Sequence, residues 1–134
     1  MSMSQEQTRK MAENYTKAWC SHDPNAVASF YAQDGRIIIN DGEPSQGRAE
    51  ISAAVQTFFN DFPDFVVRMD DIRTSGTYAV YLWTSEGTNS GPGGTGNHVK
   101  ASGWEYWRYS EDGLIVESAG HYDADDYQRQ IDGA

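Results

Sequence analysis

The chain has 134 residues, the length of one domain, and we predict a single domain over residues 1–134. Its net charge of −10, without a basic stripe, excludes nucleic acid as an expected partner. No apolar run approaches the roughly 18 residues of a membrane helix, and no signal-peptide core is visible, so we expect a cytoplasmic protein with no membrane contact.

Three helices are predicted in the first half of the chain. Residues 5–22 carry apolar side chains at helical spacing, in one stripe. A second helix begins at Asp23-Pro24, since aspartate is a favourable N-cap and proline fits the first helical position, and we expect it to reach about residue 35. A third helix, over about 48–60, has the clearest helical spacing and ends before Pro63.

The remaining predicted elements are strands. A short buried strand at 36–39 precedes the third helix, and the second half of the chain reads as hairpin-connected strands over residues 65–73, 78–88, 98–109 and 114–123. Helices first and an antiparallel sheet afterwards indicate an α+β fold. We predict a bent antiparallel sheet that forms a cone around the N-terminal helices.

Aromatic residues make up 13% of the chain, and aromatic side chains often line apolar ligand cavities. The predicted ligand-binding residues are Trp19, Phe59, Trp83, Trp107 and His98. Cys20 is the single cysteine and follows the apolar stripe of the first helix, so we predict a buried structural thiol. Zinc-type cysteine and histidine spacing is absent from the sequence, and no metal site is predicted.

The last predicted strand ends in His121 and Asp123, which share one face because side chains alternate along a strand. A histidine and a carboxylate at the open end of a sheet form a candidate proton-transferring pair. Asp123 also has a purely structural interpretation, because the residues after it could begin a helix that it caps.

A series of short motifs extends over roughly residues 5–131. They are Phe30-Tyr31-Ala32-Gln33-Asp34-Gly35, Gly47-Arg48-Ala49-Glu50-Ile51, Phe62-Pro63-Asp64-Phe65, Glu86-Gly87-Thr88-Asn89-Ser90-Gly91, Gly103-Trp104-Glu105-Tyr106-Trp107-Arg108-Tyr109 and His121-Tyr122-Asp123. In this order the chain resembles the SnoaL-like polyketide cyclase family, within the nuclear transport factor 2-like superfamily that also holds ketosteroid isomerase. The resemblance implies the cone-shaped fold of that superfamily.

The resemblance also implies roles for individual residues. Asp123 matches the general acid/base of SnoaL-type cyclases, and His121 would support it. Tyr15 and Glu105 match the two hydrogen-bond donors that stabilise the oxyanion in ketosteroid isomerase. The base of that isomerase corresponds to Ile39, which cannot move a proton, so steroid isomerase activity is not expected.

The leading hypothesis is a cofactor-independent cyclase or isomerase that acts on an apolar carbonyl compound. The alternative is a non-catalytic module of the same superfamily that binds a small molecule or dimerises. We expect a homodimer in both cases, because one face of a bent sheet would remain uncovered by helices. The glycine-rich segment 87–97 is predicted to be a long loop that could cover the open end of the cone.

Overall fold

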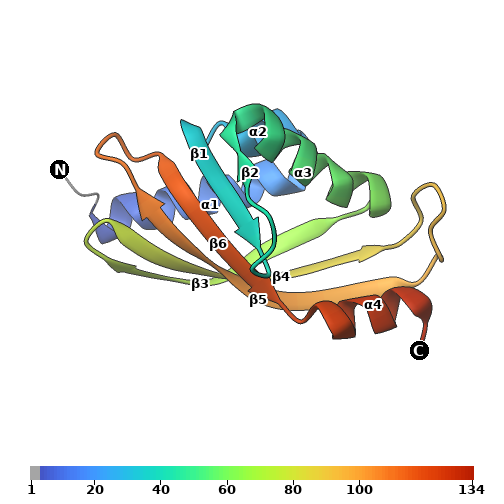
Figure 1. Ribbon diagram of the computed structural model, residues 1–134. Helices are drawn as coiled ribbons and strands as arrows, with labels where there is room; N and C mark the ends of the chain where they lie inside the picture. Colours follow the sequence, from blue (N-terminus) through green and yellow to red (C-terminus); the bar gives the residue numbers. More distant parts are fainter. Residues whose placement is uncertain (1–3) are drawn as a thin grey trace.

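The computed structural model describes residues 4–134 and contains one curved sheet with helices against its concave face and at one end (Figure 1). The elements, in chain order, are α1 (Gln5–Cys20), α2 (Pro24–Ala28), β1 (Tyr31–Ile39), β2 (Ser45–Gln46), α3 (Gly47–Asp61), β3 (Val66–Ser75), β4 (Tyr78–Thr88), β5 (His98–Tyr109), β6 (Ile115–Tyr122) and α4 (Ala124–Asp132). The predicted α+β architecture is therefore confirmed.

The sheet has the strand order β2-β1-β6-β5-β4-β3. Neighbouring strands are antiparallel except for β1 and β6, which run parallel. The prediction of a fully antiparallel sheet is wrong for this one pair. Parallel strands need a long connection, and here α3 and the β3–β5 strands lie between them in sequence.

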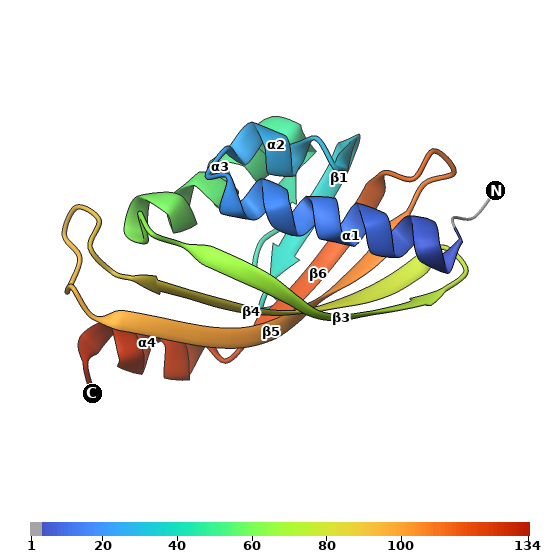
Figure 2. The same cartoon turned by 180° about the vertical axis from the view of Figure 1, so that it is seen from behind.

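Helices α1 and α3 pack against β3 and β1 respectively, so the sheet curls around them. Figure 2 shows α1 lying along the sheet, with α2 and α3 beside it. Ser4 begins α1 with a reciprocal capping box, and Asp23 caps α2 through the backbone N–H groups of Asn25 and Ala26. Within residues 4–134, no helix is long and apolar enough to cross a bilayer.

The second helix is shorter than predicted. It ends at Ala28, and Tyr31 already pairs with Ile115 of β6. Gly35 lies in an irregular part of β1, where a Cβ would meet the carbonyl oxygen of Ile115 at 2.8 Å. The Asp34-Gly35 pair therefore marks a bulge in a strand rather than the end of a helix.

Cys20 is exposed, which contradicts the predicted buried thiol. It lies on the solvent side of the last turn of α1, where its Sγ is 3.2 Å from the carbonyl oxygen of Val67. Trp19, one residue earlier, takes the inward position. The buried side of α1 therefore ends at Trp19, and a position next to the apolar stripe did not make Cys20 buried.

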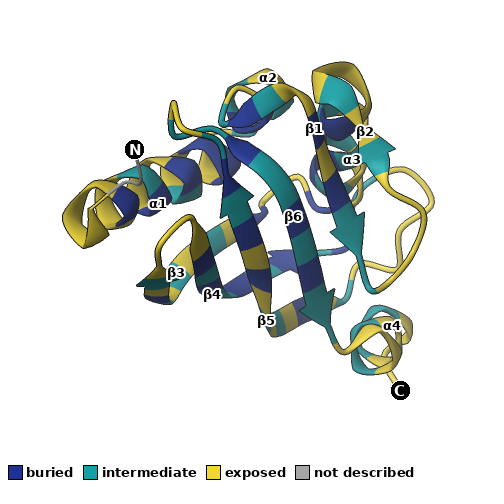
Figure 3. Ribbon diagram, turned by 60° about the vertical axis from the view of Figure 1, so that its left-hand side comes forward, coloured by how far each residue is buried: buried dark blue, intermediate teal, exposed yellow. Residues whose placement is uncertain are grey.

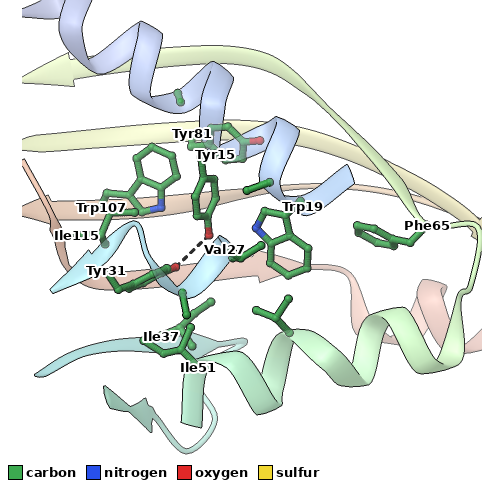
Figure 4. Packing of buried hydrophobic residues seen from close by; sticks show 14 of the residues in the cluster. Tyr15, Trp19, Val27, Tyr31, Ile37, Ile51, Phe65, Tyr81, Trp107 and Ile115 are labelled. Atoms are coloured by element: carbon green, nitrogen blue, oxygen red, sulfur yellow. Dashed lines mark hydrogen bonds between the residues drawn. The ribbon is translucent and has the colours of Figure 1, made fainter. Parts of the chain in front are cut away.

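Side chains of the concave face and of the helices form an aromatic core (Figure 4). Tyr15 lies at its centre and packs edge-to-face against Tyr81 and Trp107, with ring centroids 5.6 and 5.0 Å away. The opposite face carries exposed aromatic side chains, Tyr78 of β4 and Trp104 and Tyr106 of β5. Figure 3 shows exposed and buried positions alternating along β5. Alternation along the strands therefore separates a closed inner face from an open outer one.

Candidate functional site

A pocket of about 70 Å³ opens in the concave face of the sheet. Its buried inner end includes Trp19, Tyr81 and Glu105, and its partly exposed rim includes Phe58 and Tyr127. The other lining residues are Ile37, Ile39, Phe65, Val67, Trp83, Ser85, Gly120, His121 and Tyr122. The lining is mainly apolar, and Glu105 is the acid at its inner end.

Glu105 reaches this position through the register of β5. It pairs with Tyr81 of β4 and with Gly120 of β6, all on the concave face. Gly120 has no side chain, which leaves room beside the Glu105 carboxyl group. Gly103, two residues earlier on the same face, lets the ring of Trp83 lie across β5, because a Cβ there would stand 2.6 Å from that ring.

One oxygen of Glu105 is held by three side-chain donors. Its Oε1 accepts hydrogen bonds from the hydroxyl of Tyr15 at 2.9 Å, from Nε1 of Trp107 at 2.9 Å and from the hydroxyl of Ser118 at 2.8 Å. The other oxygen, Oε2, takes part in none of these bonds. The carboxyl group is therefore fixed in orientation through Oε1, and Glu105 is also one of the residues that line the pocket.

One of the donors to Glu105, Tyr15, is itself hydrogen-bonded to a second buried tyrosine. The hydroxyl of Tyr15 is 3.0 Å from that of Tyr31, and both side chains are fully buried. Burial, with the Glu105 charge as the next cause, raises the pKa of Tyr15 and of Tyr31 well above 10.0. Both phenols therefore keep their protons and remain hydrogen-bond donors.

Burial also raises the pKa of Glu105 above its ordinary value of 4.5. The hydrogen bonds from Trp107, Ser118 and Tyr15 act in the opposite direction, because they stabilise the ionised form. Loss of hydration is the larger effect in this apolar setting, so the neutral acid is favoured over a wider pH range than for an exposed glutamate. A neutral Glu105 would carry its proton on Oε2, because Oε1 accepts the three hydrogen bonds.

Three of the predicted site residues line this pocket with their side chains on its inner face: Glu105, Trp19 and Trp83. Three others lie behind the pocket wall. Tyr15 and Trp107 are fully buried and contact Glu105 rather than the cavity, and Phe59 packs against Trp19 with ring centroids 5.8 Å apart.

The expected position of Asp123 is wrong. Strand β6 ends at Tyr122, and Asp123 is exposed and caps α4, with its Oδ1 accepting a hydrogen bond from the backbone N–H of Asp126 at 3.0 Å. The structural interpretation of this residue, as an N-cap, is the one that the geometry supports. A carboxylate that points into solvent has no support as the acid/base of this pocket.

His121 contributes to the pocket wall, but its ring faces the other way. It pairs with Trp104 across the two strands, and the rings pack in a tilted arrangement on the outer face, with centroids 4.6 Å apart and an interplanar angle of 32°. Its Nε2 is 3.5 Å from the carboxylate of Asp41. His98 is exposed and bonds Glu86 at 2.7 Å, away from the pocket. Neither histidine ring is positioned beside Glu105.

Several residues of the site were not predicted. Ser118 and Tyr31 complete the polar cluster around Glu105, and Phe58, Phe65, Tyr122 and Tyr127 form much of the aromatic wall. Cross-strand pairing was the available signal, because Trp107 lies directly opposite Ser118. That register depends on the turn between the strands, which sequence spacing alone does not fix.

The glycine-rich loop is bound to α3 and α4 instead of covering the pocket. Asn89 hydrogen-bonds to Asp61 at the end of α3, and Asn97 bonds the carbonyl oxygen of Ile131 in α4. Helix α4 in turn places Tyr127 on the pocket rim, 5.0 Å from Tyr122 between ring centroids. Among the described residues, no cluster of potential metal ligands was found.

Comparisons with known proteins agree with this fold. The sequence profile of the SnoaL-like domain family matches residues 12–118. No curated protein sequence gives a significant match.

Solved structures give the same result. A putative SnoaL-like polyketide cyclase from Jannaschia sp. CCS1 superposes with a TM-score of 0.86 at 15% identity, covering 100% of this chain and 99% of that one. TsrD from Streptomyces laurentii gives a TM-score of 0.84 at 20% identity, with 98% and 99% covered. A protein from Catenulispora acidiphila with a ketosteroid isomerase-like fold, in complex with trimethylamine, gives 0.82 at 17% identity, with 92% of each chain covered. These likenesses confirm the predicted fold.

Proposed function

Because the chain belongs to the SnoaL-like domain family, we propose that it binds a small apolar carbonyl compound and activates it for proton transfer through Glu105. The observation that carries this proposal is the fixed carboxyl group of Glu105 at the inner end of an apolar pocket. A neutral acid in such a position can donate a hydrogen bond to a carbonyl oxygen.

The proposed chemical step is enolisation, which cyclases and isomerases of carbonyl compounds share. Glu105 transfers the proton on Oε2 to the ligand oxygen while a C–H bond next to the carbonyl breaks and its proton passes to water at the rim. A carbon–carbon double bond forms in the enol, and the reverse transfers return the proton to Glu105. A positioned acid of this kind contributes about 10²- to 10⁴-fold in rate.

The size of the pocket favours a small ligand. Binding sites for larger organic molecules usually measure about 300–1,000 Å³. A cavity of about 70 Å³ accommodates a short chain or a single small ring, and a polycyclic compound would require movement of rim side chains such as Phe58 and Tyr127.

The experiment is deuterium exchange of cyclopentanone, a small ring ketone, in deuterated water, followed by NMR. Glu105→Gln is the decisive variant, because the Gln oxygen can replace Oε1 and its amino group then points into the pocket. This variant still donates a hydrogen bond but cannot transfer a proton. We expect the wild-type protein to accelerate exchange and the variant to lose that acceleration, and equal rates would refute the proposal.

A second candidate is binding of a small alkylammonium ion without turnover. It is favoured by the aromatic walls around an acidic group, since aromatic faces attract cations, and a structural neighbour was solved with trimethylamine. The ammonium would require ionised Glu105, so Glu105→Gln should abolish trimethylamine binding while leaving ketone binding intact. Calorimetric titration of both ligands separates the two candidates.

A homodimer through the outer face of the sheet is part of this proposal. Tyr78 and Tyr106 stack there with ring centroids 5.7 Å apart, and Trp104 is 40% exposed beside them. A partner would bury these side chains. Analytical ultracentrifugation should show a dimer that Trp104→Ser weakens, whereas a monomer at micromolar concentration would contradict it.

A further inference from the structure

The indole N–H of Trp19 is a buried donor without a partner. The side chain of Trp19 is only 9% exposed and lines the pocket, and its Nε1 makes no hydrogen bond within residues 4–134. Buried polar groups are nearly always hydrogen-bonded in native proteins, and an exception at a cavity wall points to a missing acceptor.

The Tyr15 hydroxyl is the polar group that faces the Trp19 indole, and the indole influences it without forming a hydrogen bond of good geometry through Nε1. Trp19 packs edge-to-face against Tyr15, and Figure 4 shows its nitrogen on the edge of the ring turned toward the Tyr15 hydroxyl and away from Phe65. That hydroxyl donates to Glu105 and contacts Tyr31. The Trp19 donor is therefore directed toward the polar end of the pocket, where Glu105 also has an oxygen outside the bonds of the cluster.

We propose that Trp19 and Glu105 together hold one acceptor oxygen of the ligand, with the indole N–H and the carboxyl O–H as the two donors. This inference deepens the proposed function and rests on it. The donor pair differs from the one that the resemblance implied, because Trp19 takes the place of Tyr15. Tyr15 is instead a positioning residue that fixes Glu105 through Oε1.

The arrangement selects a ligand of defined chemistry. Two donors at one end of the pocket require a neutral ligand with an acceptor such as a ketone or aldehyde oxygen. The surrounding walls, among them Ile37, Phe65 and Trp83, accept only apolar surface. A hydrocarbon of the same shape would leave both donors unpaired and should bind more weakly.

The test compares cyclopentanone with methylenecyclopentane, which replaces the carbonyl oxygen with a CH₂ group. Each is titrated into nitrogen-15-labelled protein while the indole N–H signals are followed by NMR. The four tryptophans are assigned by single Trp→Phe variants. We expect the ketone alone to shift the Trp19 signal downfield, and the Trp83 signal to respond equally to both ligands.

Trp83→Phe is the matched control, since it removes an indole from the same pocket wall. Both variants lose the same side-chain volume, and this loss cancels in the ratio of ketone affinity to hydrocarbon affinity. Trp19→Phe should reduce that ratio about fivefold, while Trp83→Phe should leave it unchanged. Ketone binding that leaves the Trp19 signal unmoved, or an unchanged preference in Trp19→Phe, overturns this inference alone. Absence of saturable ketone binding overturns the proposed function as well.

Discussion

Glu105 lies within β5 and Asp123 directly follows β6, the neighbouring strand, but the two acids have opposite surroundings. Glu105 lies inside the aromatic core, with three donors on one oxygen. Asp123 stands in solvent just past the end of β6, where it caps a helix. The comparison shows that burial and fixed donors, rather than the presence of a carboxylate near a histidine, distinguish a chemical site from a structural one.

The largest expected effect comes from removing the acceptor of the cluster. Glu105→Leu would remove the acceptor shared by the buried donors of Tyr15, Trp107 and Ser118, and only Tyr15 would keep a partner, the hydroxyl of Tyr31. Each donor left without a partner costs about 1–3 kcal/mol, so we expect the free energy of unfolding in urea to fall by about 3 kcal/mol or more. Glu105→Gln, which keeps an acceptor oxygen, serves as the control and should lose far less.

A pH dependence follows from the raised pKa of Glu105. The folded protein binds this proton more tightly than the unfolded chain, so its contribution to stability is complete below the ordinary value of 4.5 and is lost as pH rises through the raised pKa. Urea unfolding of wild type and Glu105→Gln over this range should therefore give a difference that changes with pH. A constant difference would show that burial does not shift this group.

The smallest effect belongs to Asp123. Asp123→Ala should destabilise α4 by about 1 kcal/mol, the usual value of an N-cap, and increase amide hydrogen exchange in that helix. Asp125→Ala is the control, because it removes an exposed acid from the same helical turn without removing the cap. The deuterium exchange of cyclopentanone should be unaffected by Asp123→Asn, and its loss would restore this residue to the chemistry.

Much of the fold was predictable from local pattern. The bounds of β4 and β5 agree with the predicted strands 78–88 and 98–109, because alternation and turn residues are strong there. The start of β1 was missed because Tyr31 is held by Ile115, a residue far along the chain. Helical spacing around residue 30 gave no indication of that pairing.

The site was only partly predictable for the same reason. The resemblance correctly associated Tyr15 with Glu105, and the two side chains share a hydrogen bond. It could not show that Tyr15 lies behind the acid instead of beside the ligand. The sequence did not reveal which face of the sheet the His121 ring occupies. In β6 this residue pairs with Trp104, which places the ring on the outer face.

The central claim is that Glu105 is an acid kept neutral beyond the ordinary range, and a direct titration tests it. Carbon-13 NMR of the glutamate carboxyl groups, with the Glu105 signal identified by its loss in Glu105→Gln, reports its protonation at each pH. The account predicts a midpoint above 4.5. A midpoint at or below that value would contradict it, because Glu105 would then be a carboxylate held by its three donors and could not donate a proton to a ligand.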